Sequence, residues 1–446
     1  MFRPIFLGAF LSCLTAMQGQ DSASLFETHL GPLCRQGKFS GAALVAREGK
    51  PVFVTACGLA NAEWNVANTP GTVFRIASIT KQFTATAVLQ LESQGKLSVQ
   101  DPVCKYLDNC PAAWKNVTLH HLLTHTSGIP DFVALLKGFK STGQNPVAET
   151  IQLFRDLPLA FSPGTDYQYS NSGYTLLAWV VEKTSGQTLA AYLKENVFDP
   201  VGMASTRRDV QQSIIPRRAG GYSNEKGGLK NAGTSDMDRA IGAGDLLSTV
   251  EDLLRWDQSL YTEKVLPKVA LDRMFAPFRD GYAYGWMVRN KLGRQAIYHP
   301  GAGAGFQSAV IRFPQEKVTV IVLGNTSQTP SAKIAQDLAA LAFDGRVLTP
   351  ADRKAIPAEP ALLEACQGEY KLEGNGQAFN VLHADGKLLL NPVGAPVKFE
   401  LLREAGTQFF TREIDVQFTF HRDEAGKVTH LFVHQNGMDV KAGRVK

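Results

Sequence analysis

A serine and a lysine three residues apart, Ser78 and Lys81, open a long apolar stretch of this chain. Apolar side chains recur there every four residues, at Ile79, Phe83 and Ala87, which predicts a helix with one buried face. The helix would place Lys81 one turn above Ser78. A serine hydroxyl needs a partner within reach that takes its proton, and burial favours the neutral amine of a lysine. The pair therefore predicts nucleophilic catalysis by Ser78, with the helix N-terminus favouring the developing alkoxide.

The same spacing occurs twice more, as Ser93 with Lys96 and as Ser223 with Lys226. Both pairs lie in polar, glycine-containing stretches, which indicate a helix end and a loop. Neither serine would stand at a helix N-terminus, so we interpret these residues as surface serines and solvated lysines. Ser78 is the predicted nucleophile.

A second polar group, Tyr169-Ser170-Asn171, follows a Pro-Gly-Thr turn and precedes an apolar segment at residues 176–181 that predicts a helix. The same tripeptide at residues 222–224 lies between glycine pairs and has no helix after it. A lone tyrosine would otherwise be a half-buried ring whose hydroxyl meets water or a carbonyl. We therefore assign a functional role to Tyr169 and Asn171 and none to the second copy.

A third motif, His299-Pro300-Gly301, ends a predicted strand and opens a glycine-rich segment. Ser-x-x-Lys, Tyr-x-Asn and Lys- or His-x-Gly, in this order, resemble the serine β-lactamase and penicillin-binding superfamily. The resemblance is to the branch that contains class C β-lactamases, D-alanyl-D-alanine carboxypeptidases, D-aminopeptidases and family VIII esterases. Similar stretches at residues 122–128 and 284–286 extend it over about residues 25–345.

The resemblance implies a serine hydrolase that acts through an acyl-enzyme on amide or ester carbonyls. Ser78 would attack the carbonyl, while Lys81 and Tyr169 relay protons. This role requires the pKa of the Tyr169 phenol to fall through nearby cations such as Lys81. Asn171 would donate to the substrate carbonyl and orient Lys81. The resemblance leaves open whether the substrate is a β-lactam, a D-amino-acid peptide or an ester.

The third motif is implied to bind the substrate. The N–H groups of Ser78 and Ala302 would form an oxyanion hole, and Gly301 would let a substrate lie against the backbone. His299 would supply a positive or donor edge in place of the family's commoner lysine. Pro300 departs from the family pattern because it has neither an N–H nor the hydroxyl that meets a substrate carboxylate. We therefore expect weak β-lactamase activity and, because proline cannot donate to a sheet ladder, an edge strand here.

The strand and helix patterns predict an α/β fold. Hairpin patterns lie near both ends of the first 345 residues, and helical periodicity fills residues 101–203. We expect an antiparallel sheet flanked by helices with an inserted all-α lobe, the β-lactamase/transpeptidase-like fold of the resemblance. Residues 209–244 contain few apolar side chains and are expected to be loop. After residue 366 every apolar run is short, and Asp-Gly and Asn-Gly turns predict a small all-β, barrel-like domain.

Four segments make up the predicted domain organisation. Residues 1–19 combine Arg3 with an apolar run and small residues, which is typical of an export signal. Residues 20–348 would form the hydrolase domain, and a helix at residues 332–342 would close it. Residues 349–360 contain three prolines and would form a linker, and residues 361–446 would form the all-β domain.

The export signal predicts a periplasmic or secreted protein without a membrane span, because no later apolar run reaches 18 residues. Cys13 matches a lipoprotein signal poorly. In an oxidising compartment we expect a disulfide between Cys104 and Cys110, and the odd number of cysteines after the signal leaves at least one thiol unpaired within the chain.

The formal charge of +5, without a basic run and interleaved aromatics, argues against nucleic acid. The expected partner is a small-molecule or short peptide substrate, and the oligomeric state is not predicted.

Three histidines, His120, His121 and His125, raise the question of a metal site because the last two lie one helical turn apart. No acidic or third ligand accompanies them at zinc spacing. We therefore expect hydrogen-bonding roles for these histidines and neither a metal nor another cofactor.

Two other functions compete with an acyl-enzyme hydrolase. One is a serine hydrolase with a Ser-His-Asp triad, but Gly-x-Ser-x-Gly occurs nowhere in the chain, which counts against the α/β-hydrolase version. The other is a penicillin-binding or sensing module that is acylated but does not turn over. A burst of one product equivalent followed by no turnover would favour this module.

Overall fold

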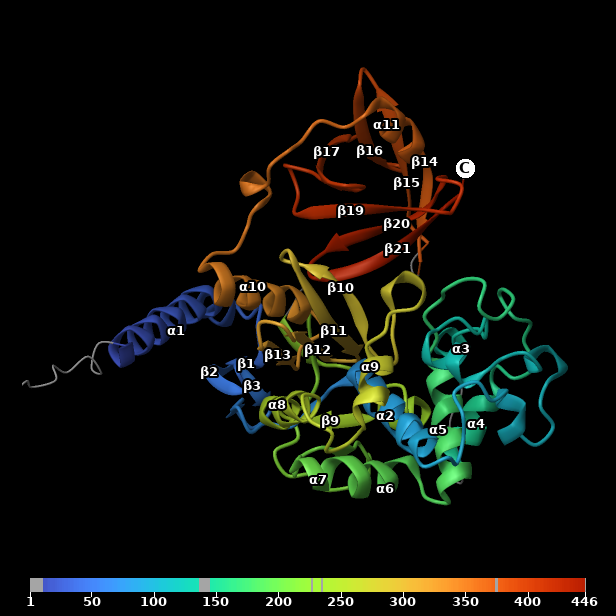
Figure 1. Cartoon of the computed structure of the whole chain (residues 1–446). Helices are drawn as coiled ribbons and strands as arrows, with labels where there is room; N and C mark the ends of the chain where they lie inside the picture. The colour runs from blue at the N-terminus through green and yellow to red at the C-terminus, as the bar shows by residue number, and fades with distance from the viewer. Residues whose placement is uncertain (1–10, 136–144, 226–227, 234–235, 374–375, 446) are drawn as a thin grey trace, which may run out of the picture. The chain divides into compact units, whose positions relative to one another are not determined.

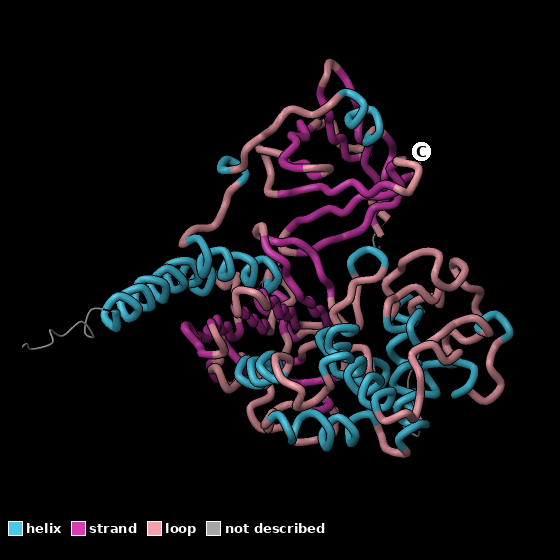
Figure 2. Tube along the Cα trace, in the orientation of Figure 1, coloured by secondary structure: helices cyan, strands magenta, loops and turns pink. Residues whose placement is uncertain are grey.

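The computed structural model describes residues 11–135, 145–225, 228–233, 236–373 and 376–445. The chain forms two compact units, Met1–Ser331 and Ala332–Lys446 (Figure 1). The first unit combines helices with strands, whereas the second consists mainly of strands (Figure 2). The predicted fold class, a β-lactamase-like α/β unit followed by an all-β domain, is therefore confirmed.

The first unit is built on an antiparallel sheet whose strands come from distant parts of the chain, in the order β10-β11-β12-β13-β1-β2. The N-terminal strands meet the C-terminal strands of this sheet where β1 pairs with β13, with Val45 opposite Val320. Strand β13 is buried along its whole length. A strand that is covered on both faces can be apolar throughout and does not alternate apolar with polar side chains. The strands are β1 (Gly41–Arg47), β2 (Lys50–Cys57), β10 (Met287–Lys291), β11 (Arg294–Gly303), β12 (Phe306–Phe313) and β13 (Val318–Gly324).

Helices predominate in residues 101–203, between these two groups of strands, as the periodicity predicted. The long helix α2 (Thr80–Ser93) is buried on nearly all sides and packs against α5 (Asn171–Ser185), and Figure 1 shows the two side by side. This contact brings the first two sequence motifs together. The other helices described in this unit are α1 (Leu11–Arg35), α3 (Leu119–Leu123), α4 (Pro146–Gln152), α6 (Leu189–Leu193), α7 (Asp199–Val201), α8 (Val250–Ser259) and α9 (Lys268–Met274).

The expectation that residues 209–244 are loop is only partly correct. They contain a hairpin of β7 (Tyr222–Glu225) and β8 (Gly228–Asn231). The described part of β8 is exposed, so backbone pairing rather than burial maintains the hairpin and no apolar alternation marks it in the sequence. Short strands complete this unit: β3 (Leu59–Asn61), β4 (Val66–Ala67), β5 (Phe74–Arg75), β6 (Arg207–Arg208) and β9 (Leu246–Ser248).

The strand that carries Pro300 is not an edge strand, contrary to our expectation. β11 lies between β10 and β12 in the sheet. Its pairing with β10 ends at Tyr298, however, so Pro300 pairs only with Ala309 of β12. Proline is accommodated because the hydrogen-bonded ladder between β10 and β11 ends before Pro300. On the β10 side, the third motif therefore has no strand partner among the described residues.

Two disulfides link parts of the first unit. The predicted bond between Cys104 and Cys110 is confirmed. A second bond, between Cys34 and Cys57, ties α1 to β2 and was not predicted. Phe26 and Phe53 pack against each other between the same two elements, with ring centroids 5.2 Å apart. Cys366 of the second unit is a free, buried thiol, as the odd number of cysteines required.

The second unit is a closed antiparallel barrel, formed where β14 pairs with β21. Its tight turns match the sequence signals: Asp385 and Gly386 both have positive φ, as do Asn436 and Gly437, which is the geometry of a type I′ hairpin turn. The barrel strands are β14 (Gly368–Leu372), β15 (Ala378–Ala384), β16 (Lys387–Pro392), β17 (Phe399–Ala405), β18 (Gln408–Phe410), β19 (Val416–Arg422), β20 (Val428–Gln435) and β21 (Met438–Arg444).

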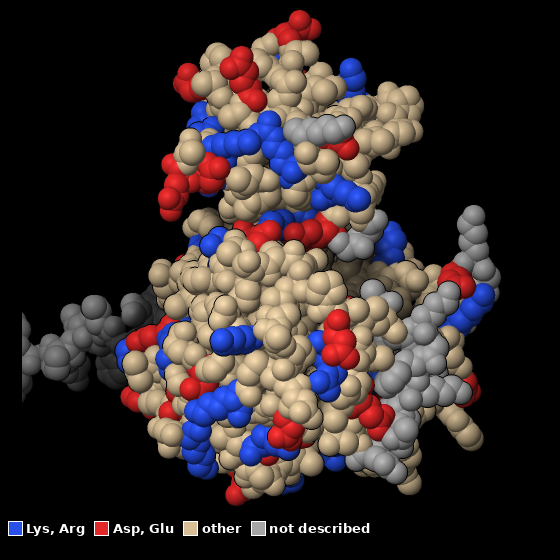
Figure 3. Space-filling model, turned by 90° about the vertical axis from the view of Figure 1, so that its right-hand side faces the viewer, with Lys and Arg blue, Asp and Glu red and all other residues tan. Residues whose placement is uncertain are grey.

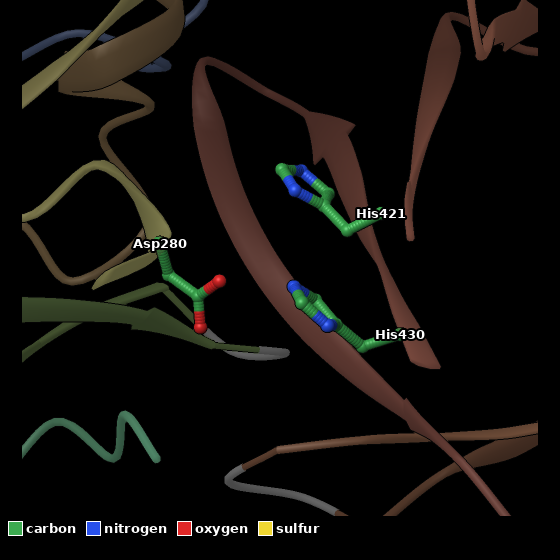
Figure 4. A group of neighbouring side chains, drawn as sticks. All are labelled: Asp280, His421 and His430. Carbon is green, nitrogen blue, oxygen red and sulfur yellow. The ribbon is translucent and has the colours of Figure 1, made fainter. Parts of the chain in front are cut away.

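Among the residues described in this unit, two α-helices accompany the barrel, α10 (Ser331–Asp344) and α11 (Pro360–Cys366). We expected α10 to close the hydrolase unit, but nearly all of it groups with the barrel, where Lys333 forms an ion pair with Asp415. The domain boundary expected at residues 349–360 remains a prediction. On the barrel wall, His421 and His430 are register partners, and Figure 4 shows their rings side by side. The two rings stack, with centroids 4.7 Å apart.

On the face drawn in Figure 3, basic and acidic side chains are interspersed over each unit. Among the described residues, no helix has both the length and the hydropathy needed to span a bilayer. The predicted export signal lies partly outside the described residues, and its end falls within α1.

Candidate active site

Ser78 lies in a tight turn that enters α2. Residues Ala77–Ile79 form one 3-10 turn, and the α-helix begins at Thr80, so Ser78 stands just before the helix N-terminus. Ala77 has φ of 46°, which is strained for a residue with a Cβ. The N–H of Ile76 donates to Leu246 O at 3.0 Å, and its carbonyl accepts from Ser308 Oγ at 2.8 Å. These contacts with the neighbouring strands fix the strained turn and the serine on it.

Lys81 is fully buried and meets three oxygens. Its Nζ lies 3.0 Å from Ser78 Oγ, 2.8 Å from Asn171 Oδ1 and 2.9 Å from the carbonyl of Ala243. Burial lowers the pKa of Lys81 to about 7, although the nearby Asp131 acts in the opposite direction. A neutral amine has two N–H groups and one lone pair. It can donate to the amide and carbonyl oxygens and accept the proton of Ser78.

Tyr169 lies two residues before the start of α5 and hydrogen-bonds with Ser78. Its ring lies 4.7 Å from Lys81 Nζ and 4.2 Å from the ring of His125. Contrary to our expectation, the pKa of Tyr169 does not fall: burial raises it well above the usual value, and this effect outweighs the opposite effect of the hydrogen bond with Ser78. Tyr169 is therefore a protonated phenol that can donate a proton.

His299 is buried, and both ring nitrogens have partners within the protein. Nδ1 lies 2.6 Å from the carbonyl of Pro300, which can only accept, so Nδ1 carries the hydrogen. Nε2, 3.0 Å from Tyr282 Oη, therefore accepts from that hydroxyl. Burial, followed by the charge of Lys81, lowers the pKa of His299 to about 3. The expected positive edge is absent from this position, because a buried imidazole between these partners stays neutral.

The backbone of β11 touches the Ser78 turn at Gly301. A Cβ at this position would lie 2.3 Å from Ile76 O, 2.3 Å from Ser308 Oγ and 3.2 Å from Ser78 N. Only glycine allows this approach. Ala302, the next residue, is exposed and pairs with Gln307. The structure thus brings the third motif against the nucleophile, and the pairing of the Ser78 and Ala302 N–H groups as an oxyanion hole remains a prediction.

The three histidines considered for a metal have separate partners. His125 Nδ1 accepts from Ser170 N at 3.1 Å, His121 Nδ1 accepts from Thr118 N at 3.2 Å, and His120 Nδ1 lies 2.8 Å from Tyr284 Oη. Burial lowers the pKa of each of them. These contacts give each histidine a structural role.

The other copies of the Ser-x-x-Lys and Tyr-Ser-Asn motifs form hydrogen bonds outside the Ser78 site. Ser93 Oγ donates to Leu89 O at 2.8 Å, and Ser223 Oγ hydrogen-bonds to Glu225 at 3.3 Å. Lys226 lies outside the described residues. The Tyr222 hydroxyl accepts from Ala62 N at 2.8 Å.

Two site residues were missed by the sequence motifs. Asp131 accepts from Asn171 Nδ2 at 2.9 Å, and Tyr282 contacts His299. Asp131 comes shortly after the family-like stretch at residues 122–128, which was the only signal for it. Tyr282 precedes Tyr284 and had no signal of its own. The spacing of a motif cannot identify partners from other segments.

Comparison with known proteins agrees with this geometry. A model of the beta-lactamase family matches residues 22–344. A penicillin-binding protein of Bacillus subtilis strain 168 is 28% identical over 454 residues, which cover 95% of this chain and 98% of that protein. A D-aminopeptidase of Gluconobacter oxydans is 28% identical over 67% of this chain and 58% of its own length. The solved structure of an octameric penicillin-binding protein homologue from Pyrococcus abyssi is 26% identical, with a TM-score of 0.65 over 94% of this chain and 99% of that one. The chain therefore belongs to the β-lactamase family of serine hydrolases.

Proposed function

We propose that this protein hydrolyses amide or ester carbonyls through an acyl-enzyme on Ser78. One observation carries the proposal: the Nζ of a buried lysine, with its pKa near neutrality, lies 3.0 Å from Ser78 Oγ. A base with such a pKa is half deprotonated at neutral pH, where general base catalysis is most effective. Asn171 would orient this amine and donate to the substrate carbonyl.

Each step conserves protons. As Ser78 Oγ bonds to the carbonyl carbon, its proton passes to Lys81 and the carbonyl oxygen becomes an oxyanion beside the N–H groups of Ser78 and Ala302. When the oxyanion collapses, the bond to the leaving nitrogen or oxygen breaks. That atom takes the proton of Tyr169, and Lys81 returns its proton to the phenolate. Water then attacks the ester and gives a proton to Lys81, and Ser78 leaves with that proton.

The substrate class follows from relatives and from the third motif. The names of the relatives point to peptides with an N-terminal D-amino acid and to penicillins. Pro300 and the neutral His299 offer no positive charge to a substrate carboxylate. We therefore favour neutral esters and D-amino-acid amides, with β-lactams as poorer substrates.

Export to an oxidising compartment belongs to the same proposal. The disulfides Cys34–Cys57 and Cys104–Cys110 support it, because such bonds persist outside the reducing cytoplasm. The predicted signal at residues 1–19 would direct the chain to the periplasm or the medium. Cleavage of this signal from the exported protein would be checked by N-terminal sequencing.

The test combines labelling and turnover. The wild type and Ser78→Ala would be treated with a fluorescent penicillin and a fluorophosphonate, with the site located by peptide mass spectrometry. A substrate panel would contain nitrocefin, p-nitrophenyl acetate, D-alanine amide and an acyl-D-Ala-D-Ala peptide. We expect labelling at Ser78 with turnover, and neither in the variant. Labelling at another serine would refute the assignment, and one product burst without turnover would favour the acylated sensing module.

A further inference from the structure

Asn171 connects Lys81 to a carboxylate that lies outside the three motifs. Lys81 Nζ is 2.8 Å from Asn171 Oδ1, and Asn171 Nδ2 donates to Asp131 Oδ2 at 2.9 Å. We propose that Asp131 is a positioning residue that holds the Asn171 carboxamide with its oxygen toward Lys81. The inference rests on the proposed function, because the position of this oxygen matters only if Lys81 is the base for Ser78.

The orientation of the amide follows from what each partner can do. A carboxylate only accepts hydrogen bonds, so Asp131 must face the NH₂ group of Asn171, and the oxygen then points the other way. Were the amide reversed, its NH₂ group would meet Lys81 and donate to the lone pair of the neutral amine. That lone pair is needed to accept the proton of Ser78. Asp131 therefore keeps Asn171 from competing with Ser78 for the base.

The segment that carries Asp131 is held against the start of α5 by hydrogen bonds. Ser172 Oγ donates to Pro130 O at 2.7 Å and accepts from Phe132 N at 2.9 Å, so one serine of the helix clamps the residues on both sides of Asp131. The second carboxylate oxygen, Oδ1, accepts from Val133 N at 3.1 Å. Both oxygens of Asp131 are therefore used as acceptors.

Asp131 also acts on Lys81 through its charge. Among the described residues, the ionisable groups that face Lys81 are this carboxylate, two imidazoles and two phenols: Asp131, His125, His299, Tyr169 and Tyr174. Burial favours the uncharged form of the imidazoles and the phenols. Burial also raises the pKa of Asp131, against the opposing effects of the Val133 N–H, the charge of Lys81 and Asn171. As a carboxylate, Asp131 is the group that favours the ammonium form of Lys81, so its loss should lower the pKa of Lys81.

The experiment compares Asp131→Ala and Asp131→Asn with the wild type and with Asp156→Asn, a matched control on an exposed carboxylate. Initial rates on the best substrate of the panel would give kcat/KM from pH 5 to pH 9, with the labelled fraction of Ser78 as the count of active sites. We expect both Asp131 variants to lose about 10- to 100-fold at neutral pH, the effect of losing a hydrogen bond to a charged group. The activity of Asp131→Asn should be no higher than that of Asp131→Ala. The asparagine side chain has one oxygen, whereas both Val133 N and Asn171 Nδ2 donate to Asp131. The control should match the wild type.

The acid limb of the pH profile distinguishes the proposed role of Asp131 at Lys81 from a general structural defect of the variants. In both Asp131 variants it should move to lower pH, because the lysine loses a favourable negative charge. A merely structural defect would lower the whole profile without moving the limb. An unmoved limb, or an asparagine variant as active as the wild type, would overturn the inference. If the wild type itself is not labelled at Ser78, the proposed function fails instead.

Discussion

Gly301→Ala should show how closely β11 must approach the nucleophile. A methyl group at this position would lie 2.3 Å from Ile76 O and 2.3 Å from Ser308 Oγ, whereas such contacts are not found below 3.0 Å. The strand or the Ser78 turn must therefore move by at least about 0.7 Å. Overpacking of this kind costs about 1–3 kcal/mol of unfolding free energy. A misplacement near 1 Å at reacting groups lowers rates by about 100-fold.

Gly303→Ala supplies the control on the same strand. Its added methyl group would meet only the Ala77 side chain, at 3.9 Å, which is an ordinary contact. Thermal unfolding, the labelling rate of Ser78 and kcat/KM would be measured for both variants. We expect the first variant to be less stable and about 100-fold slower, and the second to be close to the wild type. Equal activity of the two variants would refute the proposed contact between β11 and the Ser78 turn.

Three more predictions concern proton transfer and substrate choice. Tyr169→Phe should lower kcat by about 100-fold or more, as for other losses of a general acid; a larger effect of Tyr222→Phe would show that the wrong tripeptide was chosen. In the wild type, kcat/KM should fall tenfold per pH unit below about pH 7, because protonation of Lys81 removes the base; a profile that stays flat down to pH 5 would exclude Lys81 as that base. Pro300→Thr should raise the acylation rate by a carboxylated β-lactam relative to that by a neutral ester, because threonine supplies a hydroxyl. That argument is wrong if the wild type already hydrolyses nitrocefin at about 10⁴ M⁻¹s⁻¹, the lower end of ordinary enzymes.

Local patterns were sufficient to predict much of the fold. The period of Ile79, Phe83 and Ala87 located α2, and the Asp385-Gly386 and Asn436-Gly437 turns located barrel hairpins. The Cys104–Cys110 bond could also be predicted, because its cysteines are only six residues apart in the sequence. In each case the signal and the structure lie within the same short segment.

What the sequence did not predict depends on contacts between distant segments. Cys34 and Cys57 can pair only because α1 packs on β2. The charge of His299 depends on its burial and on Tyr282, neither of which the His-Pro-Gly motif reveals. The β7–β8 hairpin was missed for the opposite reason: its exposed strand shows no apolar pattern.

Burial explains why one small site can hold both a base and an acid. It disfavours the charged form of each group, which for Lys81 means a pKa lowered to about 7 and for Tyr169 a pKa raised above the usual value. The same environment therefore provides an amine that can accept a proton and a phenol that can donate one. Groups whose pKa values are shifted in this way divide acid and base roles between them. We infer that Lys81 takes the proton of Ser78 and that Tyr169 serves the leaving group, rather than a phenolate acting as the first base.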